Sequence, residues 1–176
     1  IGQHAAVESN GKSFWMGNDS FFMFDGSVQK IPCSVEDFVF NDIDEASQKD
    51  TFAGLNTEFN EVTWFYCSSG SNIINRSVTY NYLENVWYVG SLARSSWFDK
   101  GVYGFPQAIE FENSSTASTI STITGLTAGR SFLYSHENGN NADGIALSSS
   151  ITSGDFVLPQ AGEKLMSIKR FIPDFK

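Results

Sequence analysis

The stretch EVTWFYC at residues 61–67 decides the fold, because its β-branched and aromatic residues favour a strand and it is too short for a stable helix. Two runs of the same character follow, SVTYNYL at 77–83 and VWYVG at 86–90. Polar turn residues at 68–72 and 84–85 separate the three runs. The pattern predicts an antiparallel meander of at least three strands.

The first 31 residues repeat this pattern. Asn10-Gly11 and Asp25-Gly26 favour tight hairpin turns between short apolar runs. Strands are predicted at 4–9, 13–17, 21–24 and 28–31. Four-stranded meanders that repeat every ~40–45 residues are typical of propeller blades. We therefore expect most of one propeller-like blade in residues 1–31 and most of another in residues 51–90.

One short helix is predicted near residues 34–44, between the two meanders. Ser34 is the expected N-cap, and Asp37 stands three residues later as in a capping box. The helix should end near Asp44. An apolar stripe at helical spacing supports this prediction: Val35, Phe38, Val39 and Ile43.

Strand signals beyond residue 100 are shorter. A strand at 103–111 is expected to be an edge or bent strand, because Pro106 interrupts it. Residues 113–124 are rich in Ser and Thr and predict a solvated excursion. The other predicted strands are 131–136, 146–152, 156–158 and 164–172. We therefore expect residues 1–176 to be mainly β, in antiparallel meanders with propeller-like blades, and to be a segment of a longer chain.

Composition excludes several classes of protein. The 176 residues carry 11 Lys and Arg against 20 Asp and Glu, and the formal charge of −9 has the wrong sign for a protein that wraps DNA or binds an anionic membrane. Aromatic residues make up 15% of the chain, which argues against intrinsic disorder. No apolar run approaches the roughly 20 residues of a membrane helix. Cys33 and Cys67 are too few for a disulfide framework, and Cys67 is expected to be a buried free thiol.

No stretch predicts a catalytic, metal or cofactor site. Residues 135–144, SHENGNNADG, are rich in oxygen ligands, but they fit a glycine- and asparagine-rich turn better than the EF-hand pattern. His4 and His136 are the only histidines, and neither has neighbours that suggest zinc or a catalytic triad. Residues 125–130 lack the Lys-Ser/Thr ending of a phosphate-binding loop.

Two groups of residues leave other functions open. Glu58/Glu61 and Glu110/Glu112 could be the paired carboxylates of a glycosidase, although acidic residues also keep sheet edges soluble. Strand aromatics could stack on sugars, although they more often pack between sheets. These aromatics are Trp64, Trp87, Trp97, Tyr66, Tyr80, Tyr82 and Tyr88.

Several segments resemble tail proteins of short-tailed, podovirus-like bacteriophages. The resemblance extends over roughly residues 3–175, outside the Ser/Thr-rich stretch. It rests mainly on GKSFWMG at 11–17, FMFDGSVQ at 22–29, NTEFNEVTWFY at 56–66 and YNYLENVWY at 80–88. Shorter matches are 91–97, 135–139, 142–144 and 153–156. The sequences of these segments are similar to those of the tail hub, nozzle or DNA-stabilisation family.

The resemblance implies a structural role in the virion tail. Proteins of this family form β-propeller-bearing rings below the portal, so the expected partners are identical subunits, most plausibly six in a ring, and other tail proteins. DNA would pass through the ring during ejection without tight binding. No enzymatic activity, cofactor or membrane contact is implied. The alternatives are a receptor- or glycan-binding β module and, less favoured, a polysaccharide hydrolase that uses Glu58 or Glu61.

One acidic stretch fits the passage of DNA. Between residues 36 and 50 a single cation, Lys49, stands among six acidic residues. They are Glu36, Asp37, Asp42, Asp44, Glu45 and Asp50. An acidic channel wall would repel phosphates, although the same charge can serve solubility alone.

Overall fold

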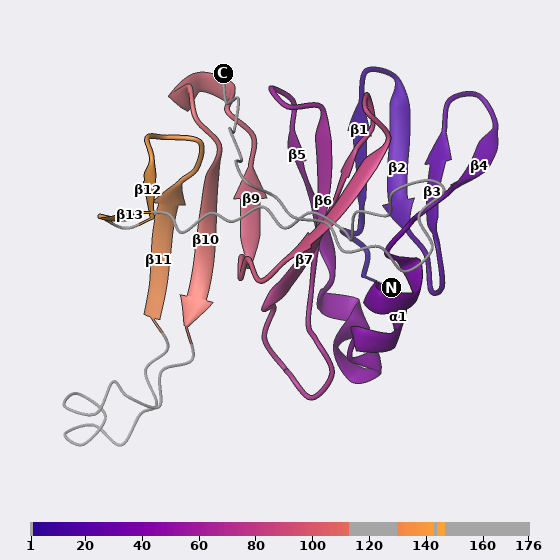
Figure 1. Cartoon of the computed structure of the whole chain (residues 1–176), viewed down its shortest axis with the longest axis horizontal. Helices are drawn as coiled ribbons and strands as arrows, with labels where there is room; N and C mark the ends of the chain where they lie inside the picture. The colour runs from indigo at the N-terminus through magenta and orange to yellow at the C-terminus, as the bar shows by residue number, and fades with distance from the viewer. Residues whose placement is uncertain (1, 113–129, 143, 147–176) are drawn as a thin grey trace, which may run out of the picture. The chain divides into compact units, whose positions relative to one another are not determined.

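The computed structural model describes residues 2–112, 130–142 and 144–146, and it confirms the mainly β class. The chain divides into two compact units, Ile1–Gly139 and Asn140–Lys176. The first contains three antiparallel sheets (Figure 1). In the described part of the second, β12 (Asn141–Ala142) pairs with β13 (Ile145–Ala146) in a short antiparallel ladder. The predicted strands at 156–158 and 164–172, most of 146–152 and the excursion at 113–124 lie outside the described residues.

The first sheet is a four-stranded meander in sequential order. Its strands are β1 (Ala6–Ser9), β2 (Lys12–Met16), β3 (Phe21–Phe24) and β4 (Val28–Ile31). The turn from β1 to β2 has positive φ at both central residues, 54° at Asn10 and 76° at Gly11, as a tight hairpin turn of this twist requires. The predicted hairpin is confirmed.

The second sheet repeats this plan with four strands in sequential order. They are β5 (Phe52–Asn56), β6 (Glu61–Tyr66), β7 (Arg76–Asn81) and β8 (Val86–Gly90). Trp64 lies opposite Val78, and Tyr80 lies opposite Trp87. The alternation of side chains along the strands therefore gathers large side chains on one face of the sheet.

The predicted helix is present as α1 (Glu36–Asp42), but its N-cap is Val35, not Ser34. The N-cap makes no side-chain hydrogen bond, so the capping box does not form. The stripe is also narrower than predicted: Val39 and Ile43 are buried, whereas Phe38 is 51% exposed. A second short helix, η1 (Glu45–Asp50), follows, and its N-cap Asp44 accepts a hydrogen bond from the Ser47 backbone.

The third sheet has the order β11-β10-β9. Its strands are β9 (Ser96–Phe98), β10 (Gln107–Glu112) and β11 (Arg130–Ser135), and a turn of 3-10 helix, η2 (Gly101–Tyr103), precedes β10. The prediction that Pro106 interrupts an edge or bent strand at 103–111 is wrong. Pro106 cannot donate to a ladder and therefore lies just before β10, which is the central strand.

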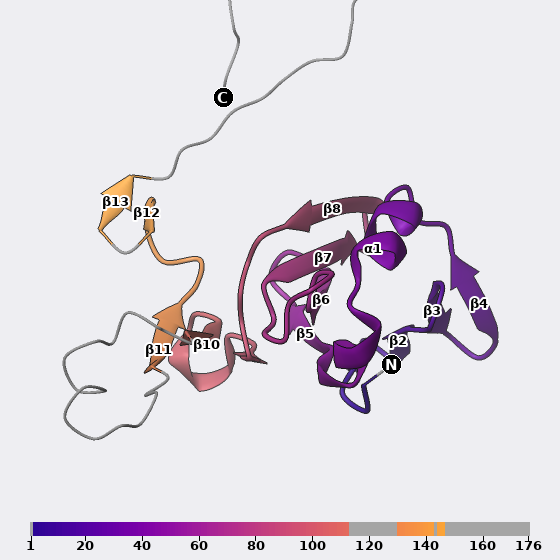
Figure 2. The ribbon, with the colours of Figure 1, turned by 90° about the horizontal axis from the view of Figure 1, so that it is seen from below.

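The three sheets stack face to face through their side chains. One face of the first sheet packs on one face of the second, and α1 lies at one end of this interface (Figure 2). The first strands of successive sheets are neighbours, β1 beside β5 and β5 beside β9, and His4 bridges Phe52 in parallel. Meanders stacked in this way, with their first strands together, are consistent with propeller-like blades.

Candidate functional site

The two faces of the second sheet differ in character. The face toward the first sheet is apolar, whereas the face toward the third sheet borders a polar cleft with a cavity of about 210 Å³. The second sheet contributes Asn56, Glu61, Thr63, Phe65, Ser77, Thr79, Tyr88 and Gly90 to this cleft. Leu92, Trp97, His136 and Glu137 complete its lining.

Strand alternation explains why these residues meet. In β5, Ala53 and Leu55 pack in the core, so Gly54 and Asn56 face the cleft. The absence of a side chain at Gly54 lets β9 lie close to β5, because a Cβ added to Gly54 would lie 2.6 Å from Cδ1 of Trp97. The Trp97 indole N–H donates to the carbonyl of Leu55 at 2.6 Å, which fixes β9 against β5.

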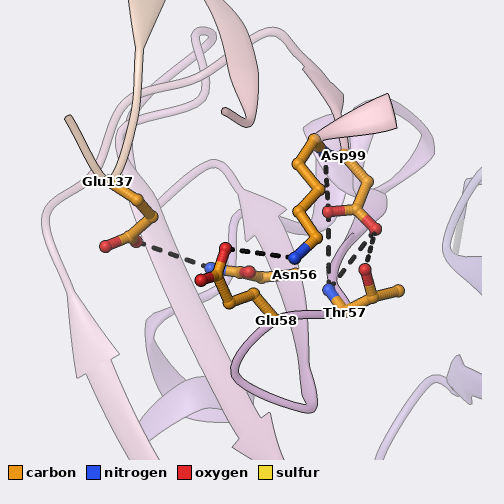
Figure 3. Close-up of polar contacts among 6 residues, drawn as sticks. Asn56, Thr57, Glu58, Asp99 and Glu137 are labelled. Carbon is orange, nitrogen blue, oxygen red and sulfur yellow. Dashed lines mark hydrogen bonds and ion pairs between the residues drawn. The ribbon is translucent and has the colours of Figure 1, made fainter. Parts of the chain in front are cut away.

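Asn56 and the two residues after it contact the segments that follow β9 and β11. Its Nδ2 donates to Oε1 of Glu137 at 3.5 Å (Figure 3). On the other side of Asn56, the Thr57 hydroxyl donates to Asp99 at 2.6 Å, and Lys100 pairs with Glu58 at 3.2 Å. These contacts connect the turn after β5 to the segments that follow β9 and β11.

A carboxyl and a phenol meet on the sheet side of the cleft. The Tyr88 hydroxyl hydrogen-bonds Glu61. The pKa of Glu61 is raised, mainly by burial and also by the nearby charge of Glu137, although the Tyr88 hydrogen bond acts in the opposite direction. Burial and the Glu61 carboxylate also raise the pKa of Tyr88. Thr63 and Thr79 form a hydroxyl pair at 2.9 Å on the same face.

A buried arginine organises the other side of the cleft. Arg94 is only 9% exposed, and its Nη1 pairs with Glu110 at 2.7 Å. Its Nε donates to Nε2 of His136 at 3.0 Å, and its guanidinium lies 4.2 Å from the centre of the Tyr134 ring. Burial, followed by the charge of Arg94, lowers the pKa of His136 to about 4. His136 is therefore neutral at pH 7 and accepts from Arg94.

The two members of the predicted Glu58/Glu61 pair lie in different surroundings. Glu58 lies in an exposed turn and pairs with Lys100, whereas Glu61 hydrogen-bonds Tyr88 in the cleft. Glu110 pairs with Arg94, and the side chain of Glu112 lies outside the description. Because Glu58 and Glu61 contact different groups, this pair does not favour a glycosidase, and the Glu110/Glu112 pair lies partly outside the described residues.

The strand aromatics mostly pack between sheets. Trp64 and Tyr66 are fully buried and Trp87 is 8% exposed, so they offer no platform for a sugar. Tyr80 is buried as well and stacks on Trp87 at 4.5 Å. Cys67 is the buried free thiol that the sequence predicts.

The remaining candidates lie apart. His4 is a backbone bridge partner of Phe52, far along the chain from His136 in the cleft. Residues 135–144 cross the boundary between the two units, and Asp143 lies outside the description. Among the described residues, no group of three or more His, Cys, Asp and Glu side chains is placed to hold a metal ion.

Both ends of the three-sheet stack expose apolar faces. The outer face of the first sheet carries Trp15 stacked on Phe22 at 5.6 Å, together with the exposed Phe24 and Val28. We call these four residues the first outer face. The third outer face, on the side of the third sheet opposite Trp97, consists of Phe98, Ile109 and Leu133, which are 39–69% exposed.

The acidic stretch in α1 and η1 is partly neutralised. Glu36 pairs with Lys30 at 2.9 Å, and Asp42 lies 3.6 Å from Arg76. Asp44 is occupied by its capping contact with Ser47. Three of the six acidic residues between positions 36 and 50 therefore interact with other groups of the chain.

Comparisons with known proteins add no family to this description. No protein-family model matches the sequence, and no curated protein matches it. None of the helices in the described residues is long and apolar enough to cross a membrane.

The sequence analysis named four residues of the cleft separately but did not bring them together: Glu61, Tyr88, Trp97 and His136. Asn56 and Glu137 are 81 positions apart, and Arg94 and His136 are 42 apart, so no local spacing brings them together. The one available signal is Asn56 itself, a polar residue that ends an otherwise apolar strand and faces the interior.

Proposed function

We propose that this chain is a structural component of a bacteriophage tail, part of the hub or nozzle ring through which DNA is ejected. The resemblance of its segments to tail proteins of short-tailed phages gives this role. The observation that supports this role is the pair of exposed apolar surfaces, the first and third outer faces. A tail ring is an assembly of subunits, and these two faces provide surfaces through which subunits can associate.

The outer faces favour head-to-tail association. Exposed contiguous apolar patches mark interaction sites, and each of these patches lies on the flat side of a sheet. The two faces are different surfaces at opposite ends of the stack. A contact between the first outer face of one copy and the third outer face of the next is therefore heterologous, and such contacts generate rings when the rotation closes.

The charge of the chain supports a conduit without DNA binding. Tight binding to duplex DNA comes mainly from Lys and Arg that neutralise phosphates, and here acidic residues exceed them by 20 to 11. DNA that passes near this chain would be repelled and would not be trapped.

The test compares two leucine substitutions. Leu133 is 69% exposed on the third outer face, and Leu83 is 73% exposed in the turn between β7 and β8. We expect the mass of the native chain to rise with concentration in light scattering, Leu133→Asp to abolish that rise, and Leu83→Asp to preserve it.

Two outcomes contradict the proposal. One is a native chain that stays monomeric at every concentration, both alone and with other tail proteins. The other is association that Leu133→Asp leaves intact, because the third outer face would then not be the contact.

A further inference from the structure

Two carboxylates and a buried amide line the cleft between the second and third sheets. Glu61 and Glu137 present carboxylates to it. Asn56 is only 5% exposed, and its Oδ1 has no hydrogen-bond partner in the described part of the chain. A buried acceptor left unpaired costs about 1–3 kcal/mol, so a donor that reaches Oδ1 after a small shift of the Asn56 side chain regains that energy.

The orientation of the Asn56 amide is fixed by its neighbour. Nδ2 points to Oε1 of Glu137 at 3.5 Å. If the amide were turned over, two oxygens would stand at that distance and repel each other. Oδ1 is therefore the atom that remains unpaired, and the ligand that complements it must bring a donor.

The walls of the cleft are suited to a hydrocarbon chain. The rings of Phe65 and Trp97 lie 5.7 Å apart, and both line the cavity. A cavity of about 210 Å³ is several times the roughly 30 Å³ that one water occupies, so a bare metal ion would leave most of it empty.

We propose that this cleft binds an alkylammonium group. The ammonium would donate to Asn56, Glu61 and Glu137, and the methylenes would pack on Phe65 and Trp97. A primary ammonium has three donors and a positive charge, which matches two carboxylates and one amide oxygen. The charge would also offset the burial and the Glu137 repulsion that raise the pKa of Glu61.

This group occurs in two sources, free polyamines and the lysine side chains of other proteins. The proposal is independent of the proposed tail function, because every residue of the cleft belongs to one compact unit of a single chain.

The first experiment titrates the full chain with n-butylammonium chloride and follows the indole N–H resonance of Trp97 by NMR. We expect a saturable shift with a dissociation constant of about 1 mM, which corresponds to about −4 kcal/mol for a ligand of five heavy atoms. Tetramethylammonium, which has no N–H donor, and neutral n-butanol should bind at least about tenfold more weakly. Equal binding of either compound, no saturable shift, or saturation by calcium chloride alone would overturn the proposal.

Matched variants locate the site. Glu61→Gln and Glu137→Gln each remove one charge from the cleft while keeping the shape of the side chain, and each should weaken binding by about tenfold, the value of one charge-assisted hydrogen bond. Asp37→Asn removes the same charge from the exposed side of α1 and should leave binding within about twofold. Equal weakening by all three would mean that only net charge matters and would refute the site.

Titrations with spermidine and with Nα-acetyl-lysine methylamide distinguish the sources. Tighter binding of spermidine indicates a free polyamine, and tighter binding of the lysine derivative indicates a protein side chain.

Discussion

The second sheet contacts a neighbour on each of its faces, and the two interfaces are built from different residues. Toward the first sheet, Phe21 packs between Trp64 and Trp87, with ring centroids 4.9 and 4.6 Å away. Toward the third sheet, a few rings are interrupted by carboxyls, hydroxyls and the unpaired Oδ1 of Asn56. Apolar burial drives folding, whereas buried polar groups cost free energy unless they are paired.

This difference separates stability from function. The apolar interface holds the two complete meanders together without help from a ligand. The polar interface departs from what packing alone would select, and such departures are expected at functional sites. We therefore expect the first interface to tolerate substitution poorly and the second to respond to ligands and pH.

The largest effect is expected from Phe21→Ala. Phe21 is completely buried between the first and second sheets, so its removal should lower the free energy of unfolding by about 3–5 kcal/mol, measured in urea. Phe24→Ala is the matched control, because Phe24 is in the same strand but is 44% exposed, and it should cost less than about 1 kcal/mol. Similar losses for the two variants would mean that the aromatic interface is not the main source of stability.

A smaller loss is expected from Gly54→Ala, which tests the second interface. The new Cβ would lie 2.6 Å from the Trp97 ring, so β9 must move away from β5, at a cost of about 1–3 kcal/mol in the free energy of unfolding. In a Trp97→Leu background the clash is reduced and the cost of Gly54→Ala should shrink, which a double-mutant cycle measures. A cost that is unchanged in that background would place the strain elsewhere.

Much of the fold could be predicted from sequence because its determinants are local. The alternation of 61–67 and the Asn10-Gly11 turn act over a few residues, and both were predicted correctly. Ser34 failed as a cap because the helix begins one residue too late for it. Pro106 was misplaced because a strand that begins just after a proline looks, in sequence, like a strand that contains one.

The candidate site could not be predicted for a physical reason. Its residues are brought together by the stacking of sheets, over separations as large as the 81 positions between Asn56 and Glu137. Asn and Arg are common on protein surfaces, so the residue types of Asn56 and Arg94 alone do not indicate a site. Their burial, which only the structure shows, is what marks them as candidates.

The smallest effect is expected from pH, and His136 at the polar interface carries it. Burial and Arg94 hold the pKa of His136 at about 4 in the folded chain, below the ordinary value of 6.5. The unfolded chain therefore takes up a proton more readily, and the contribution of His136 to stability is complete above pH 6.5 and is lost as the pH falls toward 4. Because His136 is only half-buried and solvent screens its charge, we expect a loss smaller than that of Gly54→Ala.

Urea unfolding from pH 7 to pH 4 measures this loss. The variant His136→Gln keeps an acceptor for Arg94 but does not titrate, so it should flatten part of the slope of the unfolding free energy against pH. The apolar interface contains no histidine, so Phe21→Ala should shift the whole curve down without changing its slope. An unchanged slope in His136→Gln would show that the polar interface does not sense pH through this residue.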